Sequence, residues 1–355
     1  MNHWLVVPVL LPLLCGALLM TSSRSPVQLV RFISAGSVFL LLLCAIYLLM
    51  LASAGEIQVY TLGDWSAPFG IALLLDRLSA LMLLVTALLA MFVTLYAIRG
   101  DDQRGSYFHA LLQFQLAGIN GAFLTGDLFN LFVFFEILLI ASYALLLHGL
   151  GPARIRAALH YVVLNLIGSA LFLIAAGLFY GIAGTLNMAD LARVVAQAQG
   201  DQLFLLEAAG ALLILVFGLK AAFLPLHFWL PRAYASATAP VAALFAIMTK
   251  VGLYAILRFS TLVFGEQAGA ASGLGSSVLW ILALLTMALA ALGAFAASSL
   301  TSLLAYLVLV SVGTLLAGIS VGTEAAVSAA LYYLVQSTWV IAGLFLLADL
   351  IAKQR

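Results

Sequence analysis

Charged side chains are scarce in this sequence. Its 355 residues include only 14 lysines and arginines and 13 aspartates and glutamates, so 8% are charged, whereas 66% are hydrophobic. A water-soluble globular domain carries about a quarter charged residues, and the composition excludes that class of protein. The formal net charge of +1 also excludes nucleic-acid binding that depends on neutralising phosphates.

Cysteine and signals for export are equally sparse. Cys15 and Cys44 both lie in apolar runs without CxxC spacing, so we expect no iron–sulfur cluster, no zinc site and no other cofactor. The N-terminal stretch lacks the basic start of a secretory signal, because its arginines follow the first apolar run. This order predicts a first membrane span that is retained.

Long apolar runs occupy most of the chain. They are long enough to cross about 30 Å of hydrocarbon, and the weak alternation of an outer-membrane barrel is absent, so we predict an all-α polytopic protein embedded in membrane lipid. No stretch is rich enough in serine, proline or charge to be a linker, which predicts a single transmembrane domain over residues 1–355. Hydropathy and helix breakers predict about eleven spans, at 4–21, 29–53, 71–98, 106–125, 128–149, 157–181, 203–230, 236–264, 276–297, 300–320 and 324–348.

Basic residues fall unevenly on the loops between these spans. One set of alternate loops holds Arg24, Arg31, Arg99, Arg104, Arg154, Arg156, Arg232, Lys353 and Arg355, and the other set holds Arg77, Arg193 and Arg258. Because lysine and arginine favour short cytoplasmic loops, the first set is predicted to face the cytoplasm and the N-terminus to lie outside. The two remaining basic residues, Lys220 and Lys250, lie inside apolar segments.

The two longest connecting segments are 54–70 and 184–201. We expect the first to be a loop. The second places Leu186, Leu191 and Val194 or Val195 at helical spacing beside polar neighbours. It suits either a short amphipathic helix on the membrane surface or an ordinary loop with one helical turn.

The seventh predicted span, 203–230, is too long for one straight crossing, at roughly 40 Å if fully helical. Pro225 cannot donate the hydrogen bond back to Ala221, so the helix is predicted to break one turn after Lys220. Such breaks are tolerated in a membrane only where protein or water covers the backbone, and transporters use them to build ion sites. We therefore predict a hydrated pocket at Lys220.

Glu136 is a candidate proton-binding group inside the apolar fifth span. Burial favours its protonated form, whereas a nearby lysine would hold it ionised. If Glu136 lies close to Lys220, each group changes the proton affinity of the other, and the pair can load and release one proton. The alternative is a buried glutamate that only joins helices through hydrogen bonds.

Lys250 and His227 are candidates for passing the proton on. Lys250 lies on a separate span and could exchange protons with Lys220 through water, or its amine could extend to the membrane interface instead. His227, in the stretch PLHFWLP, could relay protons toward the cytoplasm because histidine titrates near neutral pH. Alternatively it is an interfacial histidine beside Trp229.

Uncharged polar residues also occur within the spans. Asn165 and Ser169 lie one turn apart, and Ser311 lies close to Thr314; hydrogen bonds between helices account for both pairs. The last span is unusually polar, because it contains Tyr332, Tyr333, Gln336, Ser337 and Thr338. These side chains could line a water path, or they could simply pack against other helices.

Three stretches read DLFNLFVFFEILLIASYALL, GLKAAFLPLHFWLPRAYASATAPVAALFA and TKVGLYAILR. Together they resemble the antiporter-like subunits shared by Mrp-type multisubunit cation/proton antiporters and the proton-pumping arm of respiratory complex I, most closely the antiporter D subunit. The resemblance implies a fold of fourteen helices with two inverted five-helix repeats, each containing a broken helix. It matches Glu136 to a glutamate of the fifth helix, Lys220 to the lysine of the broken seventh, Lys250 to the lysine of the eighth, and His227 to the histidine after the break.

Against this fold the chain is expected to be a partial version. Residues 1–125 correspond to the N-terminal helices, 126–264 to the first proton half-channel repeat, and 276–355 to an incomplete second repeat. Gln336 stands where relatives commonly have histidine, so we expect the second half-channel to be truncated or degenerate.

The resemblance implies a membrane subunit of a monovalent cation (Na⁺ or K⁺)/proton antiporter in a bacterial inner membrane, with the other subunits of that complex as partners. It would be a transporter subunit rather than an enzyme, conducting protons through Glu136, Lys220 and Lys250. One alternative is a proton-pumping membrane subunit of an NADH:quinone oxidoreductase or a membrane-bound hydrogenase. Another is a subunit that only scaffolds assembly.

Overall fold

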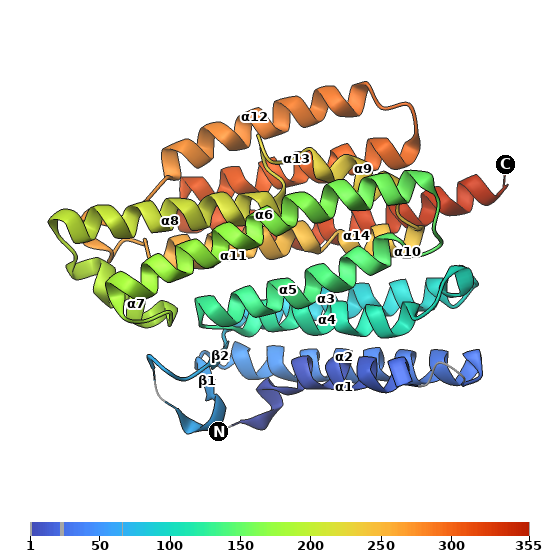
Figure 1. Ribbon diagram of the computed structural model, residues 1–355, viewed down its shortest axis with the longest axis horizontal. Coiled ribbons are helices and arrows are strands. Elements are labelled where there is room, and N and C mark those ends of the chain that lie inside the picture. Colours follow the sequence, from blue (N-terminus) through green and yellow to red (C-terminus); the bar gives the residue numbers. More distant parts are fainter. Residues whose placement is uncertain (1, 22–24, 66, 355) are drawn as a thin grey trace. The chain divides into compact units, whose positions relative to one another are not determined.

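The computed structural model describes residues 2–21, 25–65 and 67–354. Regular structure is almost entirely helical (Figure 1), which confirms the predicted all-α polytopic fold. Among the described residues, nine helices are long and apolar enough to cross a bilayer, and a shorter apolar helix, Val7–Thr21, precedes them. The count of eleven spans stays a prediction. The chain divides into two compact units, Met1–Ile155 and Arg156–Arg355.

The first unit is a bundle of five helices in which α4 packs against α1 and α5, and α2 packs against α3. Small residues let α4 approach α5 closely: a Cβ atom at Gly118 would lie 2.6 Å from the backbone nitrogen of Leu138. The elements are η1 (His3–Leu5), α1 (Val7–Thr21), α2 (Val27–Ser53), β1 (Gln58–Thr61), η2 (Leu62–Asp64), β2 (Ala72–Leu75), α3 (Arg77–Ala97), η3 (Asp101–Arg104), α4 (Phe108–Leu124) and α5 (Leu128–Leu146).

A small antiparallel hairpin replaces part of the expected loop 54–70 and the start of the expected third span. Strand β1 pairs with β2, with Gln58 opposite Leu75 and Thr61 opposite Ala72. Helix α3 begins only at Arg77 because Asp76 caps it: the Ser79 amide donates to Asp76 Oδ1 at 2.8 Å, and the Asp76 amide donates to Ser79 Oγ at 2.9 Å. The predicted start of the third span at residue 71 was therefore wrong, because residues 72–75 form strand β2 and the helix begins at Arg77.

The second unit is built around α13, which packs against α12, α14 and α9. Helix α8 packs against α11, and α10 packs against α14. The helices are α6 (Pro152–Ala183), which begins at the boundary between the units, α7 (Met188–Gln197), α8 (Gly200–Ala221), α9 (Trp229–Ser236), α10 (Ala239–Phe245), α11 (Met248–Leu262), η4 (Gly269–Ala271), α12 (Ser276–Phe295), α13 (Leu300–Val321) and α14 (Glu324–Gln354).

Segment 184–201 contains the short amphipathic helix rather than a plain loop. Asn187 caps α7 by accepting hydrogen bonds from the amides of Ala189 and Asp190 at 3.1 and 3.2 Å. Leu191 and Val195 form its buried face. Its position on a membrane surface stays a prediction.

Two predicted spans are interrupted in the second unit. The break expected in 203–230 is confirmed, since α8 ends at Ala221 and α9 begins at Trp229. A second interruption falls within the predicted span 236–264, where α10 ends at Phe245 and α11 begins at Met248. The two helices together still form one apolar stretch, Ala239–Leu262, that is long enough to cross a bilayer. The amides of Ala246 and Ile247 donate three residues back rather than four, at 3.2 and 3.3 Å, so the chain tightens into a 3₁₀-like turn before α11.

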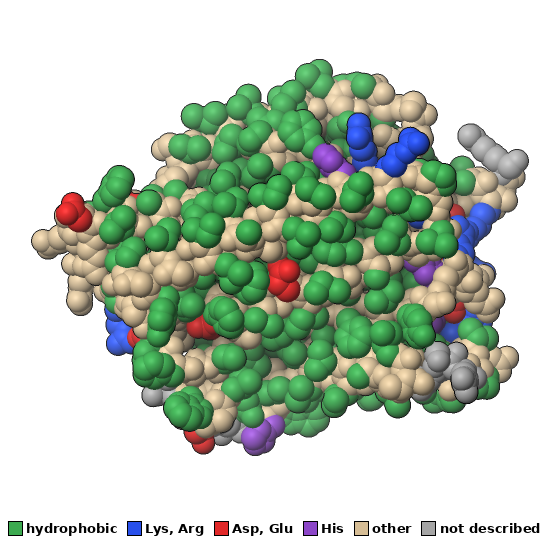
Figure 2. Space-filling view, viewed as in Figure 1, with side chains coloured by type: hydrophobic (Ala, Val, Ile, Leu, Met, Phe, Trp, Pro, Cys, Tyr) green, Lys and Arg blue, Asp and Glu red, His purple; other side chains and the backbone are tan. Residues whose placement is uncertain are grey.

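Many large hydrophobic side chains on the helices are exposed, and Figure 2 shows hydrophobic side chains spread over one face. Examples are Leu159 and Ile174 on α6, and Ile281 and Phe295 on α12, all of which are exposed. Apolar surface on this scale is stable against hydrocarbon rather than water. The composition of the surface therefore agrees with a chain embedded in lipid.

Candidate functional site

Lys220 lies at the point where α8 breaks and is only 5% exposed. The helix ends because Ala222 adopts a left-handed conformation, with φ of 64°, and the Phe223 amide then donates back to the Gly218 carbonyl at 3.2 Å. The break thus comes earlier than Pro225 alone would require, two residues after Lys220.

Two side chains from other helices satisfy backbone groups at this break. The Trp229 indole Nε1 donates to the Leu219 carbonyl at 3.0 Å, and the Leu224 amide donates to Thr286 Oγ1 on α12 at 3.0 Å. Trp229 is itself stacked on Tyr161 of α6, with ring centroids 4.8 Å apart. Unpaired backbone groups are costly when buried, so these contacts allow a helix to end inside the bundle.

The amine of Lys220 contacts α6. Its Nζ lies 3.4 Å from the carbonyl oxygen of Asn165 and 3.4 Å from the hydroxyl of Ser169. Gly168 lies between these residues, and a Cβ atom there would be 3.8 Å from Lys220 Cε and 2.5 Å from Leu219 Cδ2. The pair that sequence analysis assigned to hydrogen bonding between helices is therefore part of the lysine's surroundings.

Lys250 is fully buried near the start of α11, three residues after the 3₁₀-like turn. Its Nζ lies 3.5 Å from Ser311 Oγ on α13, and Ser311 Oγ lies 3.1 Å from Ser337 Oγ on α14. An amine that extends to the membrane interface does not fit a side chain with no exposed surface. Lys250 instead faces a cluster of hydroxyl groups.

Gly252 brings the helices of the two lysines together. A Cβ atom at this position would lie 2.5 Å from the backbone nitrogen of Ala221 and 2.9 Å from the carbonyl carbon of Lys220. Only a residue without a Cβ atom permits this approach. The backbone of α11 therefore lies directly against the end of α8, two residues from Lys250.

His227 lies in the segment between α8 and α9 and is half-buried. Its ring lies against Phe228, with centroids 4.4 Å apart. Its buried Nδ1 makes no hydrogen bond to any residue that the structure describes. The relay role of His227 stays a prediction.

Glu136 lies within α5 of the first unit and is half-buried. The neighbouring residues Phe134 and Leu138 face the glycines of α4, which fixes this part of α5 within its unit. Lys220 belongs to the second unit. The pairing of Glu136 with Lys220 stays a prediction.

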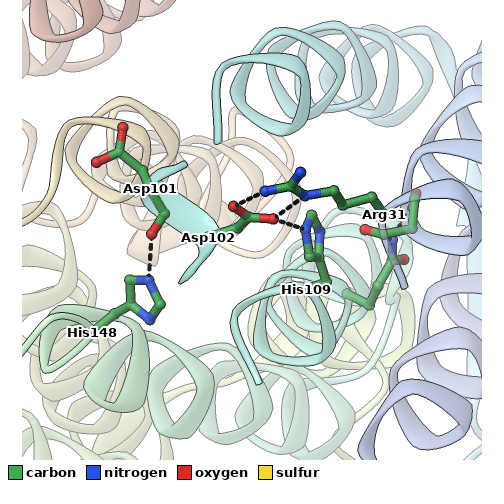
Figure 3. A network of polar contacts seen from close by, with 7 residues as sticks. Arg31, Asp101, Asp102, His109 and His148 are labelled. Atoms are coloured by element: carbon green, nitrogen blue, oxygen red, sulfur yellow. Dashed lines mark hydrogen bonds and ion pairs between the residues drawn. The ribbon is translucent and has the colours of Figure 1, made fainter. Parts of the chain in front are cut away.

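A charged network that sequence analysis missed joins α2, η3 and α4 (Figure 3). Arg31 donates two hydrogen bonds to the Asp102 carboxylate, at 2.6 and 2.8 Å, and His109 Nε2 lies 3.2 Å from the same carboxylate. Burial alone would raise the pKa of Asp102, but the hydrogen bonds and charges of Arg31 and His109 hold the pKa below its usual range.

A second contact extends this network to the end of α5. His148 Nε2 lies 2.8 Å from the Asp101 carbonyl, and Arg104 pairs with the Asp101 carboxylate at 2.8 Å. Burial lowers the pKa of His148, and the charges of Arg154 and Arg104 act in the same direction. The adjacent aspartates Asp101 and Asp102 near Arg104 were the available signal, but Arg31, which pairs with Asp102, lies 71 residues from it.

Within the described ranges, no three His, Cys, Asp or Glu residues come together in a way that could hold a metal ion. What the geometry does bring together is two buried lysines at two helix interruptions of one bundle. Charged side chains inside membrane bundles mark ion or proton pathways. Fold and site thus define a polytopic membrane protein with two lysines buried inside its helical bundle.

Comparison with known proteins shows which family of membrane proteins this chain is similar to. The family described as NADH:quinone oxidoreductase/Mrp antiporter, TM, matches residues 125–355. The D subunit of a probable K(+)/H(+) antiporter from Rhizobium meliloti is 48% identical over 360 aligned positions, covering 100% of this chain and 67% of that protein. The D subunit of the Na(+)/H(+) antiporter from Bacillus subtilis is 40% identical, covering 98% of this chain and 70% of that protein.

The fold is shared with solved members. A chain of the Mrp complex from a Dietzia species superposes with a TM-score of 0.89 at 30% identity, over 97% of this chain and 64% of that one. The present chain belongs to the NADH:quinone oxidoreductase/Mrp antiporter transmembrane family. It spans about two thirds of the length of these relatives.

Proposed function

We propose that this chain is a membrane subunit of a multisubunit monovalent cation/proton antiporter, and that it conducts protons through Glu136, Lys220 and Lys250. The observation that carries the proposal is the buried Lys220 at the break of α8, with the α11 backbone packed against it at Gly252. The antiporter names of the most similar relatives support the transport class.

In this mechanism Lys220 is the group that changes its protonation state. Its acceptors on α6 are neutral oxygens, which solvate the ammonium without holding the proton permanently. A carboxylate moving toward Lys220 would favour the ammonium, and its withdrawal would release the proton. Glu136 takes that part in the proposal, and His227, in the segment between α8 and α9, serves as a secondary relay.

Lys250 receives the proton from Lys220. The contact at Gly252 holds the two helices close together, and the chain is interrupted after Lys220 and before Lys250. Water between the amines would complete the transfer. The transported cation is Na⁺ or K⁺, the partners are the other antiporter subunits, and the location is a bacterial inner membrane with the N-terminus outside.

A second candidate is a proton-pumping membrane subunit of an NADH:quinone oxidoreductase or a membrane-bound hydrogenase, since the description of the matching family names an NADH:quinone oxidoreductase beside the antiporter. Neighbouring genes separate the two candidates. Small antiporter membrane subunits favour the first candidate, and iron–sulfur or flavin subunits favour the second.

The test uses the complete complex in everted vesicles, with cation-dependent proton exchange as the readout. Glu136→Ala and Lys220→Ala are expected to abolish exchange, and Lys250→Ala to reduce it strongly. Assembly of each complex is checked after purification. Exchange at the wild-type rate in assembled Glu136→Ala and Lys220→Ala complexes would exclude the proposed mechanism, and full activity of Lys250→Ala would favour a subunit that only scaffolds assembly.

A further inference from the structure

A line of buried hydroxyl groups leads away from Lys250. Lys250 Nζ lies 3.5 Å from Ser311 Oγ, Ser311 Oγ lies 3.1 Å from Ser337 Oγ, and Ser337 Oγ lies 3.3 Å from the Leu334 carbonyl. Lys250, Ser311 and Ser337 are 0%, 1% and 5% exposed. The line thus crosses from α11 through α13 to α14 without reaching the surface.

The contacts are ordered in one direction. Lys250 donates to Ser311, Ser311 donates to Ser337, and Ser337 donates to the Leu334 carbonyl. A serine hydroxyl carries one proton and two lone pairs, so it can accept a proton on one side and release its own on the other. Simple packing of helices does not require successive hydroxyls aligned behind a buried amine.

Ser311 and Ser337 differ from the hydroxyl residues next to them. Thr314, one turn from Ser311 on α13, donates to the Val310 carbonyl of its own helix at 3.0 Å. Its Oγ1 also lies 3.5 Å from the Met287 sulfur on α12, and it bonds to no other hydroxyl among the described residues. Thr338, beside Ser337, donates to the Leu334 carbonyl of its own helix at 2.7 Å. Ser337 also contacts the Leu334 carbonyl, but Ser311 and Ser337 in addition bond to each other between α13 and α14.

We propose that Ser311 and Ser337 form a proton relay that carries the proton from Lys250 on α11 to α14. This inference rests on the proposed function, because it continues the route that ends at Lys250. It gives a role to two serines that neither the family match nor the names of the relatives assign.

One proton moves in each passage. The Lys250 ammonium gives a proton to Ser311 Oγ as Ser311 gives its own proton to Ser337 Oγ, which leaves the amine neutral. The Ser337 hydroxyl rotates away from the Leu334 carbonyl and gives its original proton to a water molecule, which becomes hydronium. Rotation of both hydroxyls then restores the starting order.

The experiment compares variants in the complete complex, assayed as cation-dependent proton exchange in everted vesicles. Ser311→Ala and Ser337→Ala are each expected to slow exchange about tenfold to a hundredfold, up to the low end of what a positioned proton-transfer group contributes. Ser311→Thr and Ser337→Thr keep a hydroxyl and are expected to retain most of the rate. Thr314→Val, on the same helix as Ser311, is the matched control and is expected to leave the rate unchanged.

Assembly is controlled by a second pair of variants. If an alanine variant does not assemble, Ser311→Cys or Ser337→Cys takes its place, because cysteine preserves the volume and offers only a weak S–H donor. Slowed exchange in these cysteine variants supports the relay.

Lys220→Ala and Lys250→Ala are measured in parallel to separate the two proposals. Wild-type exchange in assembled serine variants, with inactive lysine variants, would overturn the relay and leave the proposed function intact. Wild-type exchange in the lysine variants would overturn both. Loss in the serine-to-alanine variants with retention in the threonine variants would support the relay.

Discussion

The indole of Trp229 donates a hydrogen bond to the carbonyl oxygen of Leu219, the residue before Lys220, at 3.0 Å. This contact spans the break between α8 and α9 and pairs a backbone group at the helix end. Trp229 is also stacked on Tyr161 of α6. The hydrogen bond of its Nε1 and the stacking of its ring therefore both hold the tryptophan in place at the break. The surroundings of Lys220 therefore depend on a tryptophan that acts through the backbone next to it.

Trp229→Phe is expected to destabilise the subunit by about 1 kcal/mol, because the indole donor is lost while an aromatic ring remains. This is the low end of the cost of about 1–3 kcal/mol for leaving a buried polar group without a partner. The cost is small because the Leu219 carbonyl also accepts a hydrogen bond from the Ala222 amide at 3.3 Å. Thermal unfolding of the purified complex measures it. Trp280→Phe on the exposed side of α12 is the control, and equal shifts in the two variants would contradict a special role for Trp229.

Gly252→Ala is expected to separate α11 from the end of α8. The added Cβ atom would meet the backbone of Ala221 at 2.5 Å, and overpacking against backbone costs about 1–3 kcal/mol. Proton exchange should slow as well, because the two lysines lie on the helices that move apart. Gly343→Ala on α14 is the matched control: nothing lies within 4 Å of its added atom, so it is expected to be neutral or stabilising by about 0.5–1 kcal/mol. Similar behaviour of the two alanine variants would show that the close approach has no functional role.

Asp102→Asn is expected to destabilise the first unit by about 3 kcal/mol at neutral pH, because it leaves Arg31 without its carboxylate. The pKa of Asp102 is lowered in the folded chain, so the carboxylate contributes its full stability above the ordinary aspartate pKa of about 4. That contribution is lost as the pH falls through the lower, folded pKa.

Unfolding temperatures of wild type and Asp102→Asn, measured from about pH 7 down to about pH 3, test this linkage. The difference between the two proteins should be largest near neutral pH and shrink in acid. Glu56→Gln, in an exposed part of the chain, is the control and should follow wild type throughout. A difference that does not change with pH would exclude the ion pair as its cause.

The sequence predicts the features that depend on local chemistry. Apolar runs predict membrane helices, and a proline after Lys220 predicts a broken helix, because both follow from neighbouring residues. The exact end of α8 depends on the left-handed Ala222 and on Trp229, which lies ten residues away from its acceptor Leu219. No local pattern encodes such a contact.

The other features that the sequence did not predict also depend on packing between residues far apart in the chain. The turn at Ala246 and Ile247 contains neither glycine nor proline, so packing rather than propensity interrupts that helix. Arg31 and Asp102 are 71 residues apart, and Ser311 and Ser337 are 26 apart, so their pairing depends on how the helices pack. The sequence places Ser311 among contacts between helices and leaves Ser337 open between a water path and packing, and only the packed bundle shows that the two hydroxyls meet.

The most direct test of the central claim, that Lys220 takes up and releases a proton, is the exchange rate of the complete complex carrying Lys220→Arg. Arginine keeps the positive charge but does not lose its proton in proteins. An assembled Lys220→Arg complex is therefore predicted to show no cation-dependent proton exchange in everted vesicles, as is Lys220→Ala. Exchange at the wild-type rate would mean that charge alone is needed at this position, and would contradict proton transfer through Lys220.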